Sequence, residues 1–257
     1  MSILDTPDKP QVKKGLVITI MGDAGSGKTT LASTFPNAYY IKTQGEGMPR
    51  DAVEPANTAT IGGKLTEDKR QWDENELFDR LVALVREDHP YKTVIIDSVT
   101  GLEDLFVSNI LAVQPEKQKT MNAAGKGYAS EWDTVRAKHG RVRKAAELLA
   151  ERKGIHVVFI AHLDVDRVEL PDADPFSKYA LQLNKKTAPI FINNVDVVAF
   201  LRQETFVVGD EGHKKAKTSG DRVAVVTMTP SGISKNRLGI TQDLPFVLGE
   251  NPFAAYL

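Results

Sequence analysis

Short apolar runs alternate with amphipathic stretches over the first 162 residues of the chain. The runs at residues 16–21, 38–41, 93–96 and 155–161 have the length and β-branched content of buried strands. Between them, apolar positions recur at helical spacing after residue 28, around residues 77–85 and 102–110, and over residues 130–152. Strands that alternate with helices in this way predict a mostly parallel sheet with helices on both faces.

The pattern changes after residue 162. Residues 195–201, 205–208 and 223–228 form strand-like apolar runs that are separated by turns rather than by helices. They predict antiparallel strands at one edge of the sheet. The expected fold class is therefore α/β, with a mainly parallel central sheet flanked by helices and antiparallel strands near the C-terminus. Polar segments rich in turn-forming residues, at residues 43–70, 114–127 and 163–188, are expected to be loops.

Composition is consistent with one globular domain. The 257 residues are 41% hydrophobic and 26% charged, with a net charge of −1, so any contact with nucleic acid would need a local patch. We expect a flexible polar tail at residues 1–14 ahead of a single domain at residues 15–257. The lack of cysteine excludes disulfides and thiolate metal sites. No apolar run approaches the ~20 residues that span a bilayer, and no apolar signal region begins the chain, so we expect a cytoplasmic protein without membrane contact.

The strongest chemical motif is a glycine-rich loop between the first strand and the first helix. Its sequence, GDAGSGKT at residues 22–29, matches the phosphate-binding pattern G-x-x-x-x-G-K-[ST]. Such a loop wraps its backbone N–H groups around a triphosphate, while the lysine reaches the β- and γ-phosphates and the last hydroxyl binds Mg²⁺. The sequence therefore predicts a site for ATP and Mg²⁺. The expected binding residues are Gly22, Asp23, Ala24, Gly25, Ser26, Gly27, Lys28, Thr29 and Thr30, with Thr29 on the metal.

A carboxylate ends the strand at residues 93–96. Because the carboxyl ends of parallel strands meet at one edge of a sheet, Asp97 is expected near the glycine-rich loop. There it would hold Mg²⁺ through water or orient the Thr29 hydroxyl. An Asp at a strand end can also serve only solvation or helix capping, and the glycine-rich loop is what favours the metal role.

Four features, taken in order, resemble the RecA-like ATPases. They are the glycine-rich loop, the strand that ends in Asp97, the strand that ends in His162, and the segment KNRLG at residues 235–239. The last is similar to the KNRFG motif of the bacterial RadA branch, and the chain looks like the phage ATPases of single-strand annealing and recombination. The resemblance covers about residues 15–245. It implies a RecA-like ATPase that forms a homo-oligomer and acts on single-stranded DNA, in the host cytoplasm if a phage encodes it.

The resemblance also implies which residues serve hydrolysis. The family's second strand usually ends in a glutamate that polarises the attacking water, but Gln44 stands there and Glu46 follows two residues later. Either Glu46 takes the role in a shifted register, or Gln44 orients the water, or hydrolysis is slow. His162 corresponds to a polar residue that senses the γ-phosphate. Lys235 and Arg237 resemble a finger that stabilises charge in the next subunit's nucleotide site.

Two polar segments, at residues 114–130 and 163–188, correspond to the family's DNA-binding loops. Lysines for phosphates and tyrosines for base stacking would suit unspecific binding of single strands. These side chains are Lys117, Lys119, Lys126, Tyr128, Lys178, Tyr179, Lys185 and Lys186. The second segment also carries acids that would repel a phosphate backbone, namely Asp164, Asp166, Glu169, Asp172 and Asp174.

Two other functions stay open at the level of the sequence. A small-molecule P-loop kinase would need a lid with arginines for the acceptor phosphate, and residues 163–188 contain only Arg167. A nucleotide-gated assembly or loading protein with little turnover is compatible with glutamine at position 44.

Overall fold

The structure, a computed structural model, describes residues 14–47, 57–115, 119–125, 130–171, 173–208 and 215–257. The tail expected at residues 1–14 lies outside the described residues except for Lys14. Within the described ranges, no helix combines the length and the apolar character that crossing a bilayer requires.

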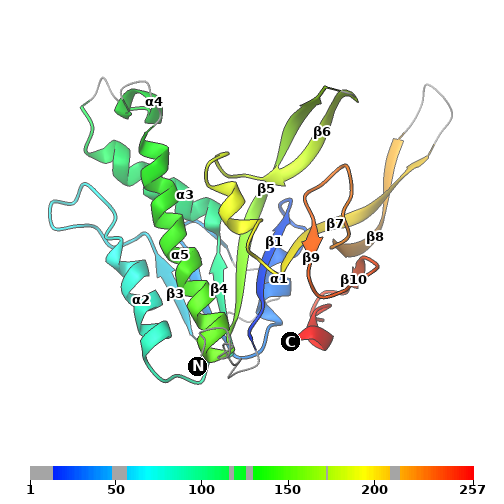
Figure 1. Ribbon diagram of the computed structural model, residues 1–257, viewed down its shortest axis with the longest axis horizontal. Helices are drawn as coiled ribbons and strands as arrows, with labels where there is room; N and C mark the ends of the chain where they lie inside the picture. Colours follow the sequence, from blue (N-terminus) through cyan, green and yellow to red (C-terminus); the bar gives the residue numbers. More distant parts are fainter. Residues whose placement is uncertain (1–13, 48–56, 116–118, 126–129, 172, 209–214) are drawn as a thin grey trace, which may run out of the picture.

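A parallel sheet forms the centre of the molecule (Figure 1). Its strands are β1 (Val17–Gly22), β2 (Ala38–Thr43), β3 (Thr58–Ile61), β4 (Thr93–Asp97), β5 (His156–Leu170) and β7 (Val197–Val208). They lie in the order β7-β1-β5-β4-β2-β3, and every neighbouring pair in this order is parallel. The strand that carries the glycine-rich loop is therefore separated from the strand that ends in Asp97 by β5 alone.

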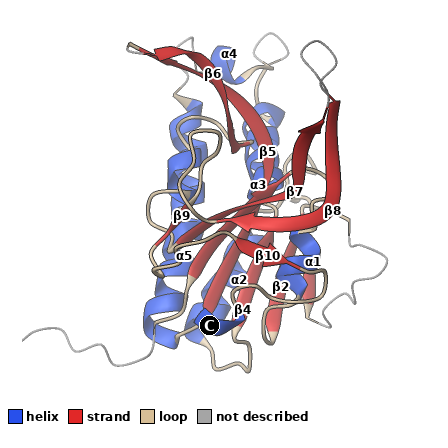
Figure 2. Ribbon diagram, turned by 90° about the vertical axis from the view of Figure 1, so that its right-hand side faces the viewer, coloured by secondary structure: helices blue, strands red, loops and turns tan. Residues whose placement is uncertain are grey.

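Antiparallel strands extend this sheet on the side of β7. They are β8 (Lys215–Val225), which pairs with β7, β10 (Leu244–Phe246), which pairs with β8, and the two-residue β9 (Lys235–Asn236), which also pairs with β7. Figure 2 shows this edge, where β7 and β8 run together beyond the body of the sheet. The expected α/β fold class is thus confirmed, although the first strand of the late group, β7, is itself parallel to β1.

Helices cover both faces of the sheet. The structure contains α1 (Lys28–Ser33), α2 (Asn75–Arg86), α3 (Val99–Ala112), α4 (Met121–Ala124), α5 (Glu131–Lys153) and the 3-10 turns η3 (Ala188–Phe191) and η4 (Ala254–Tyr256). One face packs against α2, α3 and α5, which stand in front of the sheet in Figure 1. The other face packs against α1 and the C-terminal segment at residues 238–257.

Alternation along the central strands divides the core into these two layers, because successive side chains of a strand point to opposite faces. In β5, Val157 and Phe159 join the layer under α5, whereas Val158 and Ile160 join the layer under α1. All four side chains are buried. A strand that is apolar on both faces reads as a continuous apolar run, which is how these strands were recognised in the sequence.

Three elements lie in segments that were expected to be loops. Strand β3 pairs with β2 inside residues 43–70, and the short helix α4 lies inside residues 114–127. The third is a hairpin within residues 163–188, where β5 continues to Leu170 and pairs with β6 (Ala173–Leu181). The loop prediction was wrong there because it rested on the charges and prolines of the segment, although Leu163 and Val165, and then Val168 and Leu170, alternate with charged residues as in a strand. The hairpin projects from the body of the protein in Figure 1.

Two helical glycines offer a matched test of this packing. Gly140 in α5 has nothing within 4 Å of the position that a Cβ would take, whereas a Cβ at Gly101 in α3 would overlap the Thr43 hydroxyl of β2. We expect Gly140→Ala to stabilise the protein by up to about 1 kcal/mol through helix propensity. We expect Gly101→Ala to destabilise it by about 1–3 kcal/mol through overpacking. Urea unfolding of both variants measures the two effects, and shifts of the same sign would contradict the packing of α3 against β2.

Candidate nucleotide site

The glycine-rich loop joins the end of β1 to the start of α1. Gly25 and Gly27 have φ angles of 76° and 97°, in the left-handed region that side chains other than glycine rarely adopt. Gly22 is required for a different reason, since a Cβ there would lie 2.6 Å from Ser26 Oγ and 2.7 Å from the Leu201 carbonyl oxygen. Backbone conformation therefore requires glycine at positions 25 and 27, and close packing requires it at position 22.

Lys28 lies inside this loop. Its Nζ donates to the carbonyl oxygens of Gly22 at 2.8 Å and of Asp23 at 2.9 Å, and only 8% of the residue is exposed. Burial lowers the pKa of the Lys28 ammonium, while the carboxylates of Asp97 and Glu46 oppose that shift. Ser26 Oγ is buried nearby without a hydrogen-bond partner in the described protein. A buried ammonium beside an unpartnered hydroxyl fits an anionic phosphate group.

Asp97 forms the centre of a second group of contacts. Its Oδ2 accepts hydrogen bonds from the Thr29 hydroxyl at 2.9 Å and from the Tyr40 hydroxyl at 2.6 Å. Burial raises the pKa of the Asp97 carboxyl, and the hydrogen bond from Tyr40 opposes that shift. Burial also raises the pKa of Tyr40, so its hydroxyl remains a donor. A threonine hydroxyl next to a carboxylate is the oxygen donor set that Mg²⁺ takes in sites where phosphates supply further ligands.

Glu46 lies in a third group of contacts, with Ser98 and His162. Its Oε1 accepts from Ser98 Oγ at 2.6 Å and lies 2.8 Å from His162 Nε2. The hydrogen bond from His162 lowers the pKa of Glu46, and the same bond raises the pKa of His162. Both side chains are partly open to solvent, with 21% of Glu46 and 37% of His162 exposed. The pair therefore favours an ionised carboxylate at a surface that solvent reaches.

The sheet order explains why residues so distant in sequence meet. In the register of the parallel strands, Gly22 lies opposite His162, and Asp97 lies opposite both Ile160 and Lys42. The carboxyl ends of β1, β5, β4 and β2 therefore share one edge of the sheet. Ser98 follows Asp97 directly and also accepts from the Gly101 N–H at 2.9 Å, which caps α3.

Gln44 and Glu46 have different surroundings in the structure. Gln44 is exposed, and its backbone N–H donates to the Ile61 carbonyl oxygen of β3 at 2.8 Å. Glu46, two residues later, is the one that contacts Ser98 and His162. Of the two alternatives at the end of β2, the structure thus brings Glu46 into the polar group and leaves Gln44 at its margin.

Two contacts of the site were not recognised in the sequence. Ser98 caps α3, and its hydroxyl also donates to Glu46. Tyr40 lies within a strand that was recognised only by its apolar character, and its ring is fully buried. A tyrosine in a buried strand indicates that some partner for its hydroxyl exists, but the partner depends on which strand lies alongside.

The basic pair of the KNRLG segment lies elsewhere. Lys235 Nζ donates to the carbonyl oxygens of Asn193 at 2.5 Å and Ile192 at 3.2 Å, and Arg237 reaches the same Asn193 oxygen at 3.4 Å. Strand β9 pairs with the first residues of β7, which is the end of that strand remote from the glycine-rich loop. The structure therefore does not bring Lys235 and Arg237 to the nucleotide site of their own chain.

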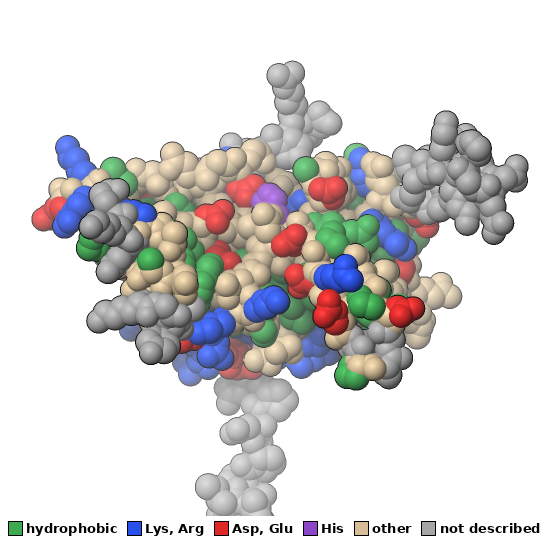
Figure 3. Space-filling view, turned by 90° about the horizontal axis from the view of Figure 1, so that it is seen from above, with side chains coloured by type: hydrophobic (Ala, Val, Ile, Leu, Met, Phe, Trp, Pro, Cys, Tyr) green, Lys and Arg blue, Asp and Glu red, His purple; other side chains and the backbone are tan. Residues whose placement is uncertain are grey.

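The expected DNA-binding side chains have mixed surroundings. Lys186 pairs with Asp133 at 3.0 Å, and Tyr179 packs its ring 5.0 Å from that of Phe200 while remaining 38% exposed. The acids Asp164, Asp166, Glu169 and Asp174 are all exposed on the β5–β6 hairpin. Lys117, Lys126, Tyr128 and Asp172 lie outside the described residues. Figure 3 looks down on the face at the carboxyl ends of the strands and shows acidic and basic side chains interspersed there.

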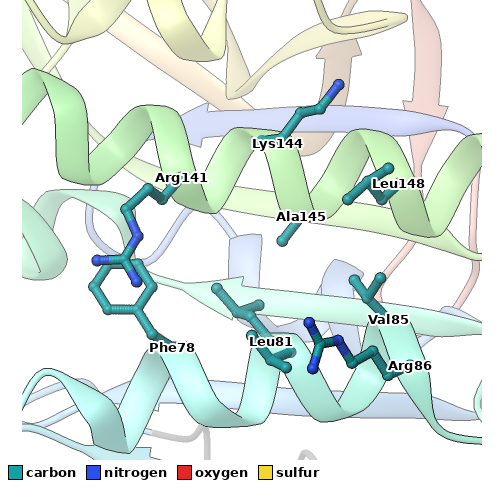
Figure 4. A pocket seen from close by; sticks show the side chains of 9 residues that line it. Phe78, Leu81, Val85, Arg86, Arg141, Lys144, Ala145 and Leu148 are labelled. Carbon is teal, nitrogen blue, oxygen red and sulfur yellow. The ribbon is translucent and has the colours of Figure 1, made fainter.

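Hollows in the surface lie both at and away from this site. A cavity of about 270 Å³ borders the tip of the glycine-rich loop, between residues 23–26, Tyr179 and Phe200. An apolar groove of about 290 Å³ lies instead between α2 and α5 (Figure 4). Its walls include Phe78, over whose ring Arg141 is stacked at 3.6 Å, and no residue of the glycine-rich loop lines it. The groove is therefore separate from the nucleotide site.

Comparison with known proteins identifies the family of the chain. No curated protein matches it. The crystal structure of the RadB recombinase has 14% sequence identity, covers 92% of this chain and 90% of its own, and superposes with a TM-score of 0.45, a likeness too small to bear on function. A family model described as an AAA domain matches residues 14–238, which include the glycine-rich loop, Asp97 and His162. Because that match spans most of the chain, this P-loop protein belongs to the AAA domain family.

Proposed function

We propose that this protein is a RecA-like ATPase that binds ATP with Mg²⁺ and uses Glu46 to activate the attacking water. The observation that carries the proposal is the meeting of three groups at one sheet edge. These are the buried Lys28 ammonium, the Thr29–Asp97 pair, and the Glu46 carboxylate held by Ser98 and His162. Phosphate binding, metal binding and proton acceptance each have a suitable group there.

Residues 22–30 would grip the phosphates in this proposal. The backbone N–H groups of the loop and the Lys28 ammonium are the donors, and Thr29 with Asp97 would hold Mg²⁺. Bound Mg²⁺ would neutralise charge on the phosphate oxygens. The Thr29 hydroxyl already donates its proton to Asp97, so the lone pairs of Thr29 Oγ1 remain free for a cation.

Glu46 is the proposed general base. Its lowered pKa keeps it ionised at neutral pH, and the two donors on Oε1 fix its orientation. The same donors reduce its basicity, so release of the His162 contact would make Glu46 a stronger proton acceptor. His162 is the proposed sensor because its imidazole can donate either to Glu46 or to a terminal phosphate oxygen.

We further propose that the protein acts on single-stranded DNA as a homo-oligomer of the phage recombination and annealing type, in the cytoplasm of the host. Strand β5 supports coupling between nucleotide and DNA, because it continues without a break from His162 into the projecting hairpin that carries Lys178 and Tyr179. Lys235 and Arg237 would serve a neighbouring subunit, since they lie far from the site of their own chain. Residues 15–257 would act as one domain.

Loss of the buried ammonium should abolish tight nucleotide binding. We expect Lys28→Ala to weaken the affinity for ATP by about tenfold or more, because charge-assisted hydrogen bonds to phosphate are lost. Titration with a fluorescent, non-hydrolysable ATP analogue measures the affinity. Lys14→Ala is the matched control, since Lys14 is an exposed lysine that pairs with Glu151 at 3.7 Å. Equal affinity of Lys28→Ala and the wild type would refute the proposed phosphate site.

The choice between Glu46 and Gln44 can be tested by turnover. We expect Glu46→Gln to retain nucleotide binding and to lower the hydrolysis rate by about a hundredfold or more, because the proton acceptor is removed. Gln44→Ala should keep turnover within about twofold of the wild type, since its side chain is exposed. Release of phosphate, measured with and without single-stranded DNA, provides the rates. A wild type that binds ATP without turnover in either condition would instead favour a nucleotide-gated assembly or loading protein.

The DNA proposal predicts salt-dependent binding through the hairpin. We expect labelled single-stranded DNA to bind at low salt with ATP and to dissociate as salt rises, because phosphate contacts release counterions. The variant Lys178→Ala/Tyr179→Ala should bind several-fold more weakly, through loss of about one phosphate contact and one stacking surface. Lys144→Ala is the control, because Lys144 lies on α5, outside the hairpin, and pairs with Glu147 of the same helix. No binding by the wild type at low salt would contradict the DNA role.

A further inference from the structure

Tyr40 makes a contact that the proposed function does not yet explain. Its side chain is fully buried, and its hydroxyl donates to Asp97 Oδ2 at 2.6 Å. Thr29 donates to the same oxygen at 2.9 Å. Asp97 itself is 2% exposed, so this shared oxygen is removed from solvent and depends on the protein for its hydrogen bonds.

A purely structural role does not account for the hydroxyl. The ring of Tyr40 lies in the apolar layer under α1, in the company of Ile20, Ile95 and Ile160. Phenylalanine would fill that volume without the desolvation cost of a buried hydroxyl. The buried hydroxyl of Tyr40 is stabilised by the hydrogen bond that it donates to Asp97. Any functional effect of the hydroxyl is therefore expected at the Asp97 carboxylate.

Two donors on one oxygen restrict how the carboxylate can turn. With Oδ2 held by Tyr40, the proton of Thr29 has a fixed acceptor, and the lone pairs of Thr29 Oγ1 point elsewhere. Without the Tyr40 hydroxyl, Asp97 could rotate about its side-chain bonds and leave the Thr29 proton without that acceptor. Orientation of a metal-binding hydroxyl by such an outer contact is a general way in which proteins adjust metal affinity.

We propose that Tyr40 is a positioning residue that sets the Mg²⁺ requirement of the site by holding Asp97 against Thr29. The inference rests on the proposed ATP–Mg²⁺ site and adds to it a residue from the interior of β2. Tyr40 touches neither phosphate nor metal in this account, and acts only through Asp97.

The test is a Mg²⁺ titration of nucleotide binding, without turnover. Tyr40→Phe removes one oxygen atom from a buried ring, and Tyr39→Phe is the matched control because Tyr39, its neighbour on β2, is only partly buried and packs against Tyr91. Binding of a fluorescent, non-hydrolysable ATP analogue is measured in EDTA and then across Mg²⁺ concentrations. We expect equal binding of wild type and Tyr40→Phe in EDTA. The Mg²⁺ concentration at half-saturation should rise about five- to tenfold in Tyr40→Phe, as the loss of one such hydrogen bond implies.

A double-mutant cycle with Asp97→Asn decides whether Tyr40 acts through Asp97. In that background Tyr40→Phe should cause no further change in the Mg²⁺ requirement, and the two substitutions should also be non-additive in urea unfolding of the metal-free protein. Additive effects in both measurements, or an unchanged Mg²⁺ response of folded Tyr40→Phe, would overturn the inference and leave the nucleotide site standing. A wild type that binds no nucleotide would overturn the proposed function, and this inference with it.

Discussion

Parallel pairing of β1 with β5, of β5 with β4 and of β4 with β2 fixes where the polar side chains of the site lie. Strands β1, β4 and β2 end at the same edge of the sheet, and β5 passes that edge at His162. Gly22, Asp97 and His162 become neighbours although at least 65 residues separate any two of them. A change in strand order would disperse the site even if every strand were retained, because no local segment holds two of these residues together.

The order of the strands also determines which partners the buried polar groups find. Lys28, Asp97 and Tyr40 lie within the apolar layers or at their margin, where an unpartnered polar atom is costly. Each finds its partner on another strand or in the glycine-rich loop. The network therefore stabilises the strand order that creates it, while Glu46 and His162 form its partly exposed portion.

Two surface features lie outside the group of side chains that forms the nucleotide site. The β5–β6 hairpin combines Tyr179 with four exposed acids, and the groove between α2 and α5 lies on the helical layer away from the phosphate loop. The match to the AAA domain family covers both the P-loop core and the strands that project from it (Figures 1 and 2).

The sequence by itself determined the features that a local rule encodes. Apolar runs indicated the parallel strands β1, β2, β4 and β5, helical spacing indicated α2, α3 and α5, and the residue types of the glycine-rich loop indicated its conformation. It left the hairpin at residues 163–181 unrecognised, because the charges and prolines of that segment indicated a loop and only the pairing of β5 with β6 shows the two strands. Only the tertiary structure placed Glu46 beside Ser98, paired Tyr40 with Asp97, and placed Lys235 away from the site of its own chain. Those outcomes depend on which strands lie side by side and in what register, and hydrogen bonds between distant segments set both.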